Sequence, residues 1–392
     1  MGNHFLITDY LWFQEGPGVR NTQYTSSGVK LLNVSNFVEG RIDLSTSSRY
    51  ISSEEANGKY KHFLVDEGDF IIASSGIQVD YFEKKMGFIR PEQLPLCMNT
   101  STIRFKNLKP DELDMRYFMY YLKSNAFKNQ LSRHIVGSAQ LNFGPSHLKK
   151  MTFPMVAMER QRYIVDNLEK VYTLISLRKE QLRKLDQLVK SRFIELFGDP
   201  VYNNNGLPAK KLCELGSLDR GRSQHRPRND PKLLNGPYPL IQTGEVASAG
   251  LYITEYKNTY SELGLQQSKM WKAGTLCITI AANIAQTAIL TFDACFPDSV
   301  VGFVPNDAVS AIYMHYWFGF FQKILEEQAP QVAQKNINLK ILSDLDVMVP
   351  TKEQQEQFAA FVEQTDKSKL AIQQSLDKLE LLKKSLMQEY FG

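Results

Sequence analysis

The chain contains the same segment twice, 194 positions apart, and this repeat constrains the fold more than any other sequence feature. Residues 182–198 and 376–392 carry identical residues at nine positions. In the first copy these are Leu182, Lys184, Leu185, Leu188, Lys190, Ser191, Glu195, Phe197 and Gly198. The match continues upstream at the same spacing, from Gln161 to Gln355. Because solenoid repeats are only roughly 20–50 residues long, this repeat predicts two similar modules related by pseudo-twofold symmetry.

Each copy of the repeat ends in a stretch without proline or glycine, at residues 159–197 and 352–391. The apolar residues of both stretches fall at heptad-like spacings, which predicts two long helices. The stripe positions are Leu168, Val171, Ile175, Leu182, Leu185 and Val189, then Val362, Ile372, Leu376, Leu379, Leu382 and Leu386. A helix of roughly 37 residues is about 55 Å long, so we expect the two to cover each other as an antiparallel coiled coil. The alternative is that each folds back on its own domain as a core helix.

The rest of the sequence predicts an α+β fold with two mixed α/β modules. Strand patterns at 29–34 and 238–242 occur at corresponding places, each followed by a polar turn. Aromatic stretches at 116–122 and 312–318 have helical spacing, which favours core-facing helices over a surface that stacks on bases. The expected boundaries are 1–152 and 201–348 for the modules, and 153–200 and 349–392 for the helical regions.

Composition and motifs favour a soluble binding protein over a membrane protein or an enzyme. Hydrophobic residues make up 43% of the chain, no apolar run approaches a membrane span, and no signal peptide is present, so we expect a cytoplasmic protein. The cysteines Cys97, Cys213, Cys277 and Cys295 lack metal-ligand spacing and are expected to be buried. No phosphate-binding loop, metalloprotease motif or nucleophile elbow occurs. We therefore expect no catalytic residue, metal or cofactor in this chain.

A net charge of +4 is too small to argue for nucleic acid, so any such function depends on local clusters. The strongest cluster lies at residues 220–228, where arginines suit phosphates and guanine, and the alternative is a solvated basic loop. Carboxamides after strand-like runs could read adenine, although those that recur in both halves could equally form structural turns. The predicted DNA-binding residues are Arg220, Arg222, Gln224, His225, Arg226, Arg228, Asn283, Gln286, Gln334, Lys335, Ser74, Ser75, Gln78 and Gln140.

In this duplicated order, the motifs resemble those of the specificity subunit of type I restriction-modification enzymes. The resemblance covers the whole chain and is carried by segments 28–36, 67–76 and 238–244, and by Phe153-Pro154 and Val349-Pro350, each followed by a Glu-X-Gln run. Two departures occur. The first module shows no counterpart to residues 211–216, and Pro154 lies seven residues before Gln161 whereas Pro350 lies five before Gln355.

The resemblance implies two target recognition domains that read a bipartite, asymmetric site in double-stranded DNA, with the coiled coil as spacer. It also implies two methyltransferase subunits as partners, which modify adenine N6 with S-adenosylmethionine, and it allows restriction subunits that use ATP and Mg to join. The alternatives are a coiled-coil scaffold that joins proteins, and a nuclease or methyltransferase whose site is not recognised in the sequence.

Overall fold

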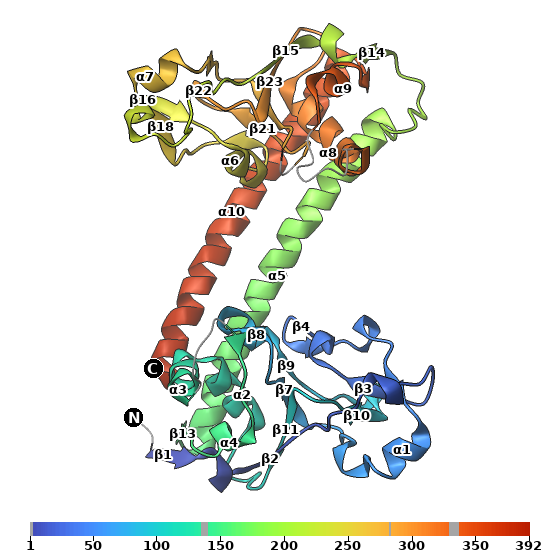
Figure 1. Cartoon of the computed structure of the whole chain (residues 1–392), viewed down its shortest axis with the longest axis vertical. Helices are drawn as coiled ribbons and strands as arrows, with labels where there is room; N and C mark the ends of the chain where they lie inside the picture. The colour runs from blue at the N-terminus through green and yellow to red at the C-terminus, as the bar shows by residue number, and fades with distance from the viewer. Residues whose placement is uncertain (1–2, 135–139, 282–283, 329–336) are drawn as a thin grey trace. The chain divides into compact units, whose positions relative to one another are not determined.

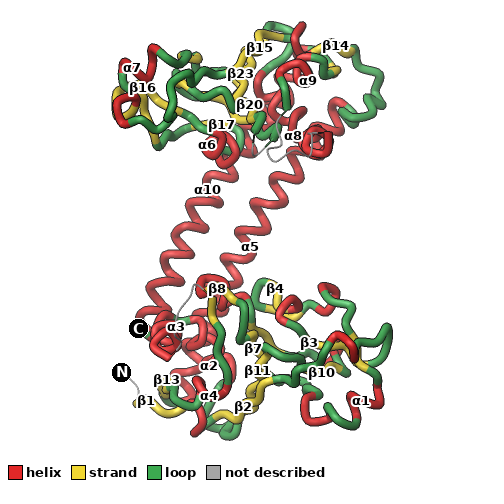
Figure 2. The backbone as a smooth tube through the Cα atoms, in the orientation of Figure 1, coloured by secondary structure: helices red, strands yellow, loops and turns green. Residues whose placement is uncertain are grey.

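The computed structural model describes residues 3–134, 140–281, 284–328 and 337–392 (Figure 1). It divides into two compact units, each of which combines a globular part with segments of both long helices. Unit 1 contains residues 1–178 and 375–392, and unit 2 contains residues 179–374. Both units mix helices and strands (Figure 2). The α+β class is therefore confirmed, whereas the four sequence boundaries stay a prediction.

Unit 1 is built on a four-stranded antiparallel sheet in the order β2-β11-β7-β9 and a three-stranded sheet in the order β10-β3-β6. Its strands are β1 (Asn3–Leu6), β2 (Leu11–Glu15), β3 (Val29–Leu32), β4 (Phe37–Val38), β5 (Arg41–Ile42), β6 (Tyr50–Ile51), β7 (Phe70–Ala73), β8 (Ile77–Gln78), β9 (Met86–Phe88), β10 (Leu96–Met98), β11 (Thr102–Asn107), β12 (Gln140–Leu141) and β13 (Thr152–Met155). Its helices are α1 (Ser53–Asn57), α2 (Met115–Lys123), α3 (Asn125–His134), α4 (Pro145–Leu148), the first part of α5 (Met158–Phe197) and the last part of α10 (Lys352–Phe391).

Unit 2 has a five-stranded sheet in the order β15-β23-β20-β21-β17 and a four-stranded sheet in the order β18-β16-β22-β19. Its strands are β14 (Ala209–Lys211), β15 (Gly216–Arg220), β16 (Leu234–Leu240), β17 (Tyr252–Ile253), β18 (Asn258–Tyr260), β19 (Met270–Trp271), β20 (Leu276–Thr279), β21 (Thr287–Leu290), β22 (Ala294–Cys295), β23 (Val300–Pro305) and β24 (Asp346–Met348). Its helices are the last part of α5, α6 (Thr243–Ser248), α7 (Glu262–Gln266), α8 (Ala311–Gln328), α9 (Leu339–Ser343) and the first part of α10.

The two long helices form where the sequence predicts them. Helix α5 ends before Gly198, whose φ of +82° is a conformation that favours glycine. In unit 1, Arg160 lies 4.0 Å from Glu389, and Lys383 lies 4.8 Å from the ring centroid of Tyr172. The contacts move from Glu389 towards Lys383 on α10 as they move from Arg160 towards Tyr172 on α5. The two helices therefore run antiparallel within this unit.

The helix segments of unit 2 also run antiparallel. The ammonium of Lys369 lies 2.7 Å from the carboxylate of Asp186, and the Gln354 carboxamide donates to the Leu196 carbonyl at 3.5 Å. Among the stripe positions, the buried ones are Leu168, Val171, Ile175, Val189, Val362 and Leu376. The half-buried ones are Leu182, Leu185, Ile372, Leu379 and Leu386, and Leu382 is exposed.

Residues matched by the repeat make matched hydrogen bonds where each long helix begins. The carboxamide of Gln161, which is 0% exposed, accepts from the Asp114 amide at 2.9 Å and donates to the carbonyls of Glu112 and Val156. Gln355 repeats this set with the Ser310 amide and the carbonyls of Ala308 and Pro350. The different proline spacing therefore leaves the backbone contacts of the two junctions alike.

Replacing Gln161 with leucine is expected to lower the free energy of unfolding of unit 1 by about 1–3 kcal/mol, because an apolar side chain leaves buried backbone groups without partners. Denaturant titration measures the loss, and Gln355→Leu should cost unit 2 a similar amount. The exposed neighbour Arg162 is the matched control, and Arg162→Leu should change stability by less than about 0.5 kcal/mol. Equal effects of Gln161→Leu and Arg162→Leu would contradict the anchoring role.

The predicted aromatic helices are buried in the cores. Tyr117 of α2 donates to the Pro154 carbonyl at 3.0 Å, and Tyr313 of α8 donates to the Met348 carbonyl at 2.9 Å. The end of the opposite long helix packs on each tyrosine. Phe391 lies 5.3 Å from Tyr117 in unit 1, and Phe197 lies 5.1 Å from Tyr313 in unit 2, measured between ring centroids. The rings of Tyr117 and Tyr313 are therefore core residues, and neither is available to stack on bases.

Two sequence expectations are corrected. Unit 1 does contain a counterpart to residues 211–216, because β1 pairs with β13 as β14 pairs with β24, and a short 3-10 helix follows both β1 and β14. Backbone pairing forms these strands, so their side chains need not be alike. Cys97, Cys277 and Cys295 are buried as expected, whereas Cys213 is exposed. No helix in the described ranges has the length and hydropathy to cross a membrane.

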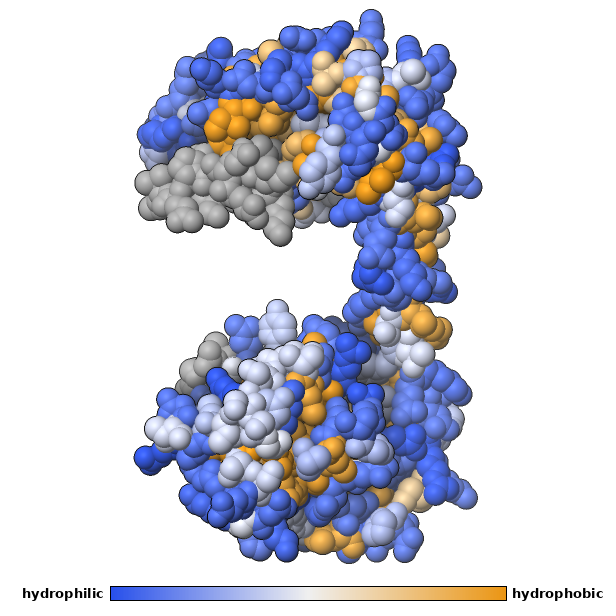
Figure 3. Space-filling view, turned by 90° about the vertical axis from the view of Figure 1, so that its right-hand side faces the viewer, coloured by the Kyte–Doolittle hydropathy of each residue, from blue (hydrophilic) through white to orange (hydrophobic). Residues whose placement is uncertain are grey.

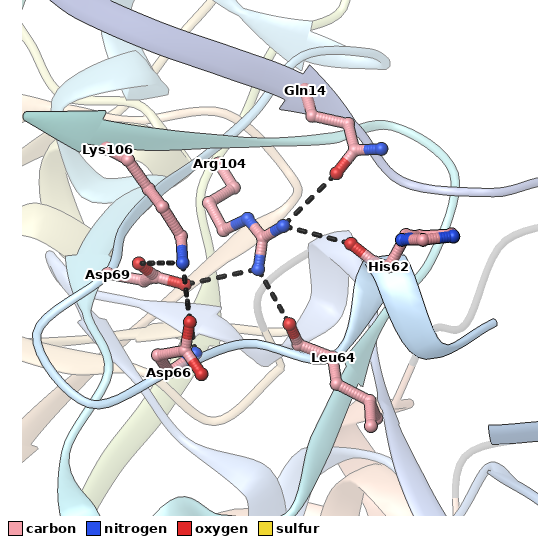
Figure 4. Close-up of polar contacts among 7 residues, drawn as sticks. All are labelled: Gln14, His62, Leu64, Asp66, Asp69, Arg104 and Lys106. Atoms are coloured by element: carbon pink, nitrogen blue, oxygen red, sulfur yellow. Dashed lines mark hydrogen bonds and ion pairs between the residues drawn. The ribbon is translucent and has the colours of Figure 1, made fainter. Parts of the chain in front are cut away.

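A buried arginine holds together the strands and loops of unit 1 (Figure 4). Arg104 on β11 is 4% exposed and lies 3.3 Å from the Asp69 carboxylate. Its guanidinium also donates to the carbonyls of Leu64 and His62 at 2.6 and 2.9 Å and to the Gln14 carboxamide at 3.1 Å. One buried cation therefore joins three segments that are distant in the sequence.

Candidate nucleic-acid interface

The arginine-rich loop begins where β15 ends, at one end of the five-stranded sheet of unit 2. Arg220 at the end of β15 is paired with Val301 near the start of β23. Thr279 at the end of β20 is paired with Val300, and β21 begins beside it at Thr287. Loop 221–230 thus begins at the end of the sheet where β20 ends and β21 begins.

Exposed guanidinium groups gather on this loop, but they differ in how they are held. Arg220 and Arg222 are exposed and have no ion-pair partner among the residues that the structure describes. Nearby, the carboxylate of Asp219 forms an ion pair with Lys269, whose ammonium lies 2.8 Å away and lowers the pKa of the carboxyl. The charge of Arg222 also contributes to lowering the pKa of Asp219, and the exposed guanidinium groups of Arg220 and Arg222 are both accessible to phosphates.

Arg226 and Arg228 also stabilise the loop itself. Arg226 donates to the carbonyls of Ser223 and His225, and its guanidinium lies 3.8 Å from Asp298. Arg228 lies 2.6 Å from the same carboxylate. Asp298 thus offsets part of the positive charge of both side chains, which the loop sequence alone does not show.

Gln224 and His225 are exposed on the same loop. The His225 ring lies 3.1 Å from the Asp230 carboxylate, and the His225 amide donates to the Gln267 side chain at 3.1 Å. These contacts fix the position of His225 within the loop and beside Gln267. All six residues that the sequence predicts on this loop are exposed.

A cavity of about 350 Å³ lies beside this loop, at the carboxyl ends of the parallel strands β16 and β22. Arg228 and Asn229 line it from the loop, and Gln242, Asn258 and Tyr260 line it from β16, β18 and the turns around them. The sequence shows a polar turn after residues 238–242, which is a signal for Gln242. Arg228 is also among the sequence candidates, whereas the sequence gives no signal for Asn229, Asn258 or Tyr260, because β18 pairs with β16 only after α6 and β17 have intervened in the chain.

The candidates in unit 1 have mixed outcomes. Ser74 is 0% exposed, so its prediction as a DNA contact is wrong in this fold. The Ser75 hydroxyl donates to the Asn142 side chain at 2.8 Å, which also accepts from the Gly76 amide, so this asparagine shapes a turn. Gln78 is exposed, and it is paired with Gln140 between β8 and β12.

The remaining candidates lie elsewhere or outside the described residues. Gln286 lines a separate cavity of about 460 Å³ with Thr287 and His315. Burial lowers the pKa of His315 to about 4, and its ring lies 3.0 Å from the Thr287 hydroxyl. Asn283, Gln334 and Lys335 lie outside the described residues, so their roles stay predictions.

No group of three or more histidine, cysteine or acidic side chains within the described ranges is placed to hold a metal ion. The polar groups at the sheet edge are instead arginines, carboxamides and hydroxyls, which bind by charge and hydrogen bonding.

Two segments of the chain, at residues 20–187 and 209–381, match the type I restriction modification DNA specificity domain. The chain belongs to this family. A relative within the specificity family is the type I restriction enzyme MjaVIII specificity subunit of Methanocaldococcus jannaschii, which is 23% identical over 177 residues. That match covers 45% of this chain and 41% of the relative's length.

Chains solved from type I restriction-modification systems have a similar fold. The S subunit of the type I restriction-modification system of M. genitalium superposes with a TM-score of 0.58 at 14% identity, over 100% of this chain and 96% of that one. A chain solved for the complex assembly and conformational transition of a type I R-M system has a TM-score of 0.59 at 16% identity, over 99% and 97% of the two chains. At these identities the likeness concerns the fold.

Proposed function

We propose that this chain is the DNA-reading subunit of a type I restriction-modification complex, with no catalytic site of its own. The observation that supports this best is the pair of exposed guanidinium groups at Arg220 and Arg222, which form no ion pair within the described ranges, in a specificity-domain chain. Arginines supply affinity through phosphates, and base-edge contacts supply sequence discrimination.

Each unit reads one half of a bipartite, asymmetric site in double-stranded DNA. The two units share a scaffold but carry different loops: residues 16–20 follow β2, whereas residues 221–230 follow the equivalent β15. The antiparallel coiled coil of α5 and α10, with its pseudo-twofold repeat, sets the gap between the halves.

The helices also hold the catalytic partners, which are two methyltransferase subunits that use S-adenosylmethionine and, where present, restriction subunits that use ATP and Mg. Large apolar side chains are exposed on α5 and α10, at Tyr163, Leu174, Leu177, Leu188, Ile194, Leu370, Leu381 and Leu382. Figure 3 shows apolar surface among the hydrophilic surface of the helices. Such side chains suit contacts with other subunits.

Selection from a random duplex pool tests the proposal. The full chain, with its methyltransferase partner, is expected to enrich a split motif with a fixed gap, and a chain without DNA specificity would enrich none. Cleavage or methyl transfer by the isolated chain with DNA, Mg²⁺ and S-adenosylmethionine would show that it is an enzyme instead.

Arg222→Ala is expected to weaken binding to all duplexes alike and to reduce the slope of log affinity against log salt by about 1, because one phosphate contact is lost. Affinity measured at several salt concentrations checks this. Lys210→Ala is the matched control. Lys210 is an exposed cation on β14, which precedes the start of β15, whereas the arginine loop follows the end of β15. An unchanged slope in Arg222→Ala would contradict the phosphate role.

A further inference from the structure

Unit 1 contains a cavity of about 700 Å³ where α3 lies beside the C-terminal end of α10 (Figure 1). The charged residues that line it are four lysines and two glutamates, at Lys123, Lys128, Lys383, Lys384, Glu83 and Glu380. Lys383 lies 3.4 Å from Glu83 and 3.8 Å from Glu380, so a single lysine engages both acids. The other three lysines form no ion pair among the residues that the structure describes. The wall of the cavity therefore carries an excess of positive charge.

Lys123 is held at this cavity by aromatic rings. Its ammonium lies 5.0 Å from the ring centroid of Tyr120 and 4.9 Å from that of Tyr172, and it has no hydrogen-bond acceptor within the described ranges. Burial lowers the pKa of this ammonium to about 8, although the charge of Glu83 acts in the opposite direction. A cation that has lost hydration without gaining an acceptor is stabilised by an anion bound next to it.

Helix α3 begins at the same cavity. Ser124 separates α3 from α2, and its hydroxyl accepts from the Phe127 amide at 3.2 Å. The amides of Asn125 and Ala126, which line the cavity, have no acceptor in the described part of the chain. Unpaired amides and the helix dipole attract anions to the N-terminus of a helix. Backbone donors and lysine side chains thus line one cavity.

The corresponding cavity of unit 2, of about 460 Å³, is built differently. Lys123 directly follows the aromatic stretch 116–122, and Gly319 directly follows the stretch 312–318. Helix α8 continues unbroken through Gly319, so no helix begins at this point of unit 2. Asp366, which lines the cavity of unit 2, stands 194 positions after Tyr172. The helix break and the lysine of unit 1 are therefore not required by the repeated scaffold.

We propose that the cavity of unit 1 binds a small organic phosphate, whose phosphoryl group is held by Lys123 and by the two amides at the start of α3. The cavity lies in the range of about 300–1,000 Å³ that is typical of small-molecule sites. Tyr172, Leu381 and Met387 give it apolar surface for the organic part of the ligand, which a phosphate of a DNA backbone would not need. Because Lys384 of α10 lines the same cavity, the bound ligand stabilises the packing of α10 on unit 1.

Titration of the full chain with inorganic phosphate and with phenyl phosphate, against chloride at equal ionic strength, tests the proposal. Both phosphates should slow hydrogen exchange at the amides of residues 125–127. Phenyl phosphate should bind more tightly, because its ring meets the apolar wall. Absence of protection by both ligands would overturn the phosphate site, and equal affinities would overturn the organic part of the proposal.

Asn125→Pro removes one amide donor from the start of α3. Proline is favoured at the first position of a helix, and Ser124 already has the extended backbone that precedes proline, with a ψ of 158°. The variant should therefore fold and bind phosphate about 10-fold more weakly. Asn125→Ala keeps the amide and is the matched control. Equal affinities of these two variants would refute the role of the amide.

Lys123→Met removes the ammonium and keeps an apolar side chain of similar length. It should weaken phosphate binding roughly 10-fold or more without lowering the denaturation midpoint in chloride. Lys170→Met is the matched control, because Lys170 is exposed on α5 and does not line the cavity. Unchanged phosphate affinity in Lys123→Met would overturn the site. If Lys123→Met weakened the binding of duplex DNA as much as that of phosphate, the phosphoryl group would belong to the DNA backbone, and the proposal of a small ligand would be wrong.

Discussion

Replacing Arg104 with methionine is expected to lower the free energy of unfolding of unit 1 by about 3–5 kcal/mol, because it leaves the Asp69 carboxylate buried without its main partner. The carbonyls of His62 and Leu64 lose their donors in the same step. Lys106 compensates only weakly, since its ammonium lies 3.9 Å from Asp69. Urea denaturation and hydrogen exchange of the amides in residues 60–75 measure the loss.

Lys106→Met is the matched control for Arg104→Met. Lys106 lies two residues away on the same strand and pairs with Asp66, but both side chains are more exposed, at 40% and 70%. Exposed pairs contribute about 0–1 kcal/mol, so the control should cost little. Adding Asp69→Asn to Arg104→Met should recover part of the loss. If both single replacements cost the same, the buried pair does not hold unit 1 together.

Phe193→Ala is expected to lower the free energy of unfolding of unit 2 by about 3–5 kcal/mol, because truncation of a buried phenylalanine leaves a cavity. Phe193 on α5 is fully buried, and its ring centroid lies 5.5 Å from that of Tyr313 on α8 and 5.4 Å from that of Phe358 on α10. The replacement therefore weakens the packing of α5 on both α8 and α10 within unit 2.

Denaturant unfolding and hydrogen exchange in α8 measure the effect of Phe193→Ala. Its sequence neighbour Ile194 is 44% exposed, so Ile194→Ala is a matched control that should change stability by less than about 0.5 kcal/mol. A small effect of Phe193→Ala, equal to that of the control, would show that the aromatic cluster does not anchor the helix.

The sequence predicts the long helices and the aromatic cores well, because periodicity and the absence of breakers are local properties. Strand β1 carries no local sequence signal, because backbone hydrogen bonds define it and its side chains do not resemble those of β14. The burial of Ser74 was also invisible, since it depends on Phe143 and Ser101, whose backbones bond to it from other segments.

The candidate interface could be predicted only in part for a similar reason. Glycine and proline in residues 220–228 indicate an exposed loop, and the loop is exposed. Its charge balance is set by Asp298, 70 residues from Arg228 in the sequence. The cavity depends on the parallel pairing of β16 with β22, a long-range contact that no local pattern encodes.

The packing of Phe391 on Tyr117 means that unit 1 needs residues 375–392, which are made after all of unit 2. At about 5–20 residues per second, a ribosome takes roughly 10–40 s to translate the intervening stretch. During that interval the nascent first half exposes an aromatic surface that only a later part of the same polypeptide can cover. Chaperones therefore encounter the nascent chain with the core of unit 1 incomplete. We expect chaperone binding to decrease once the last turns of α10 have been translated.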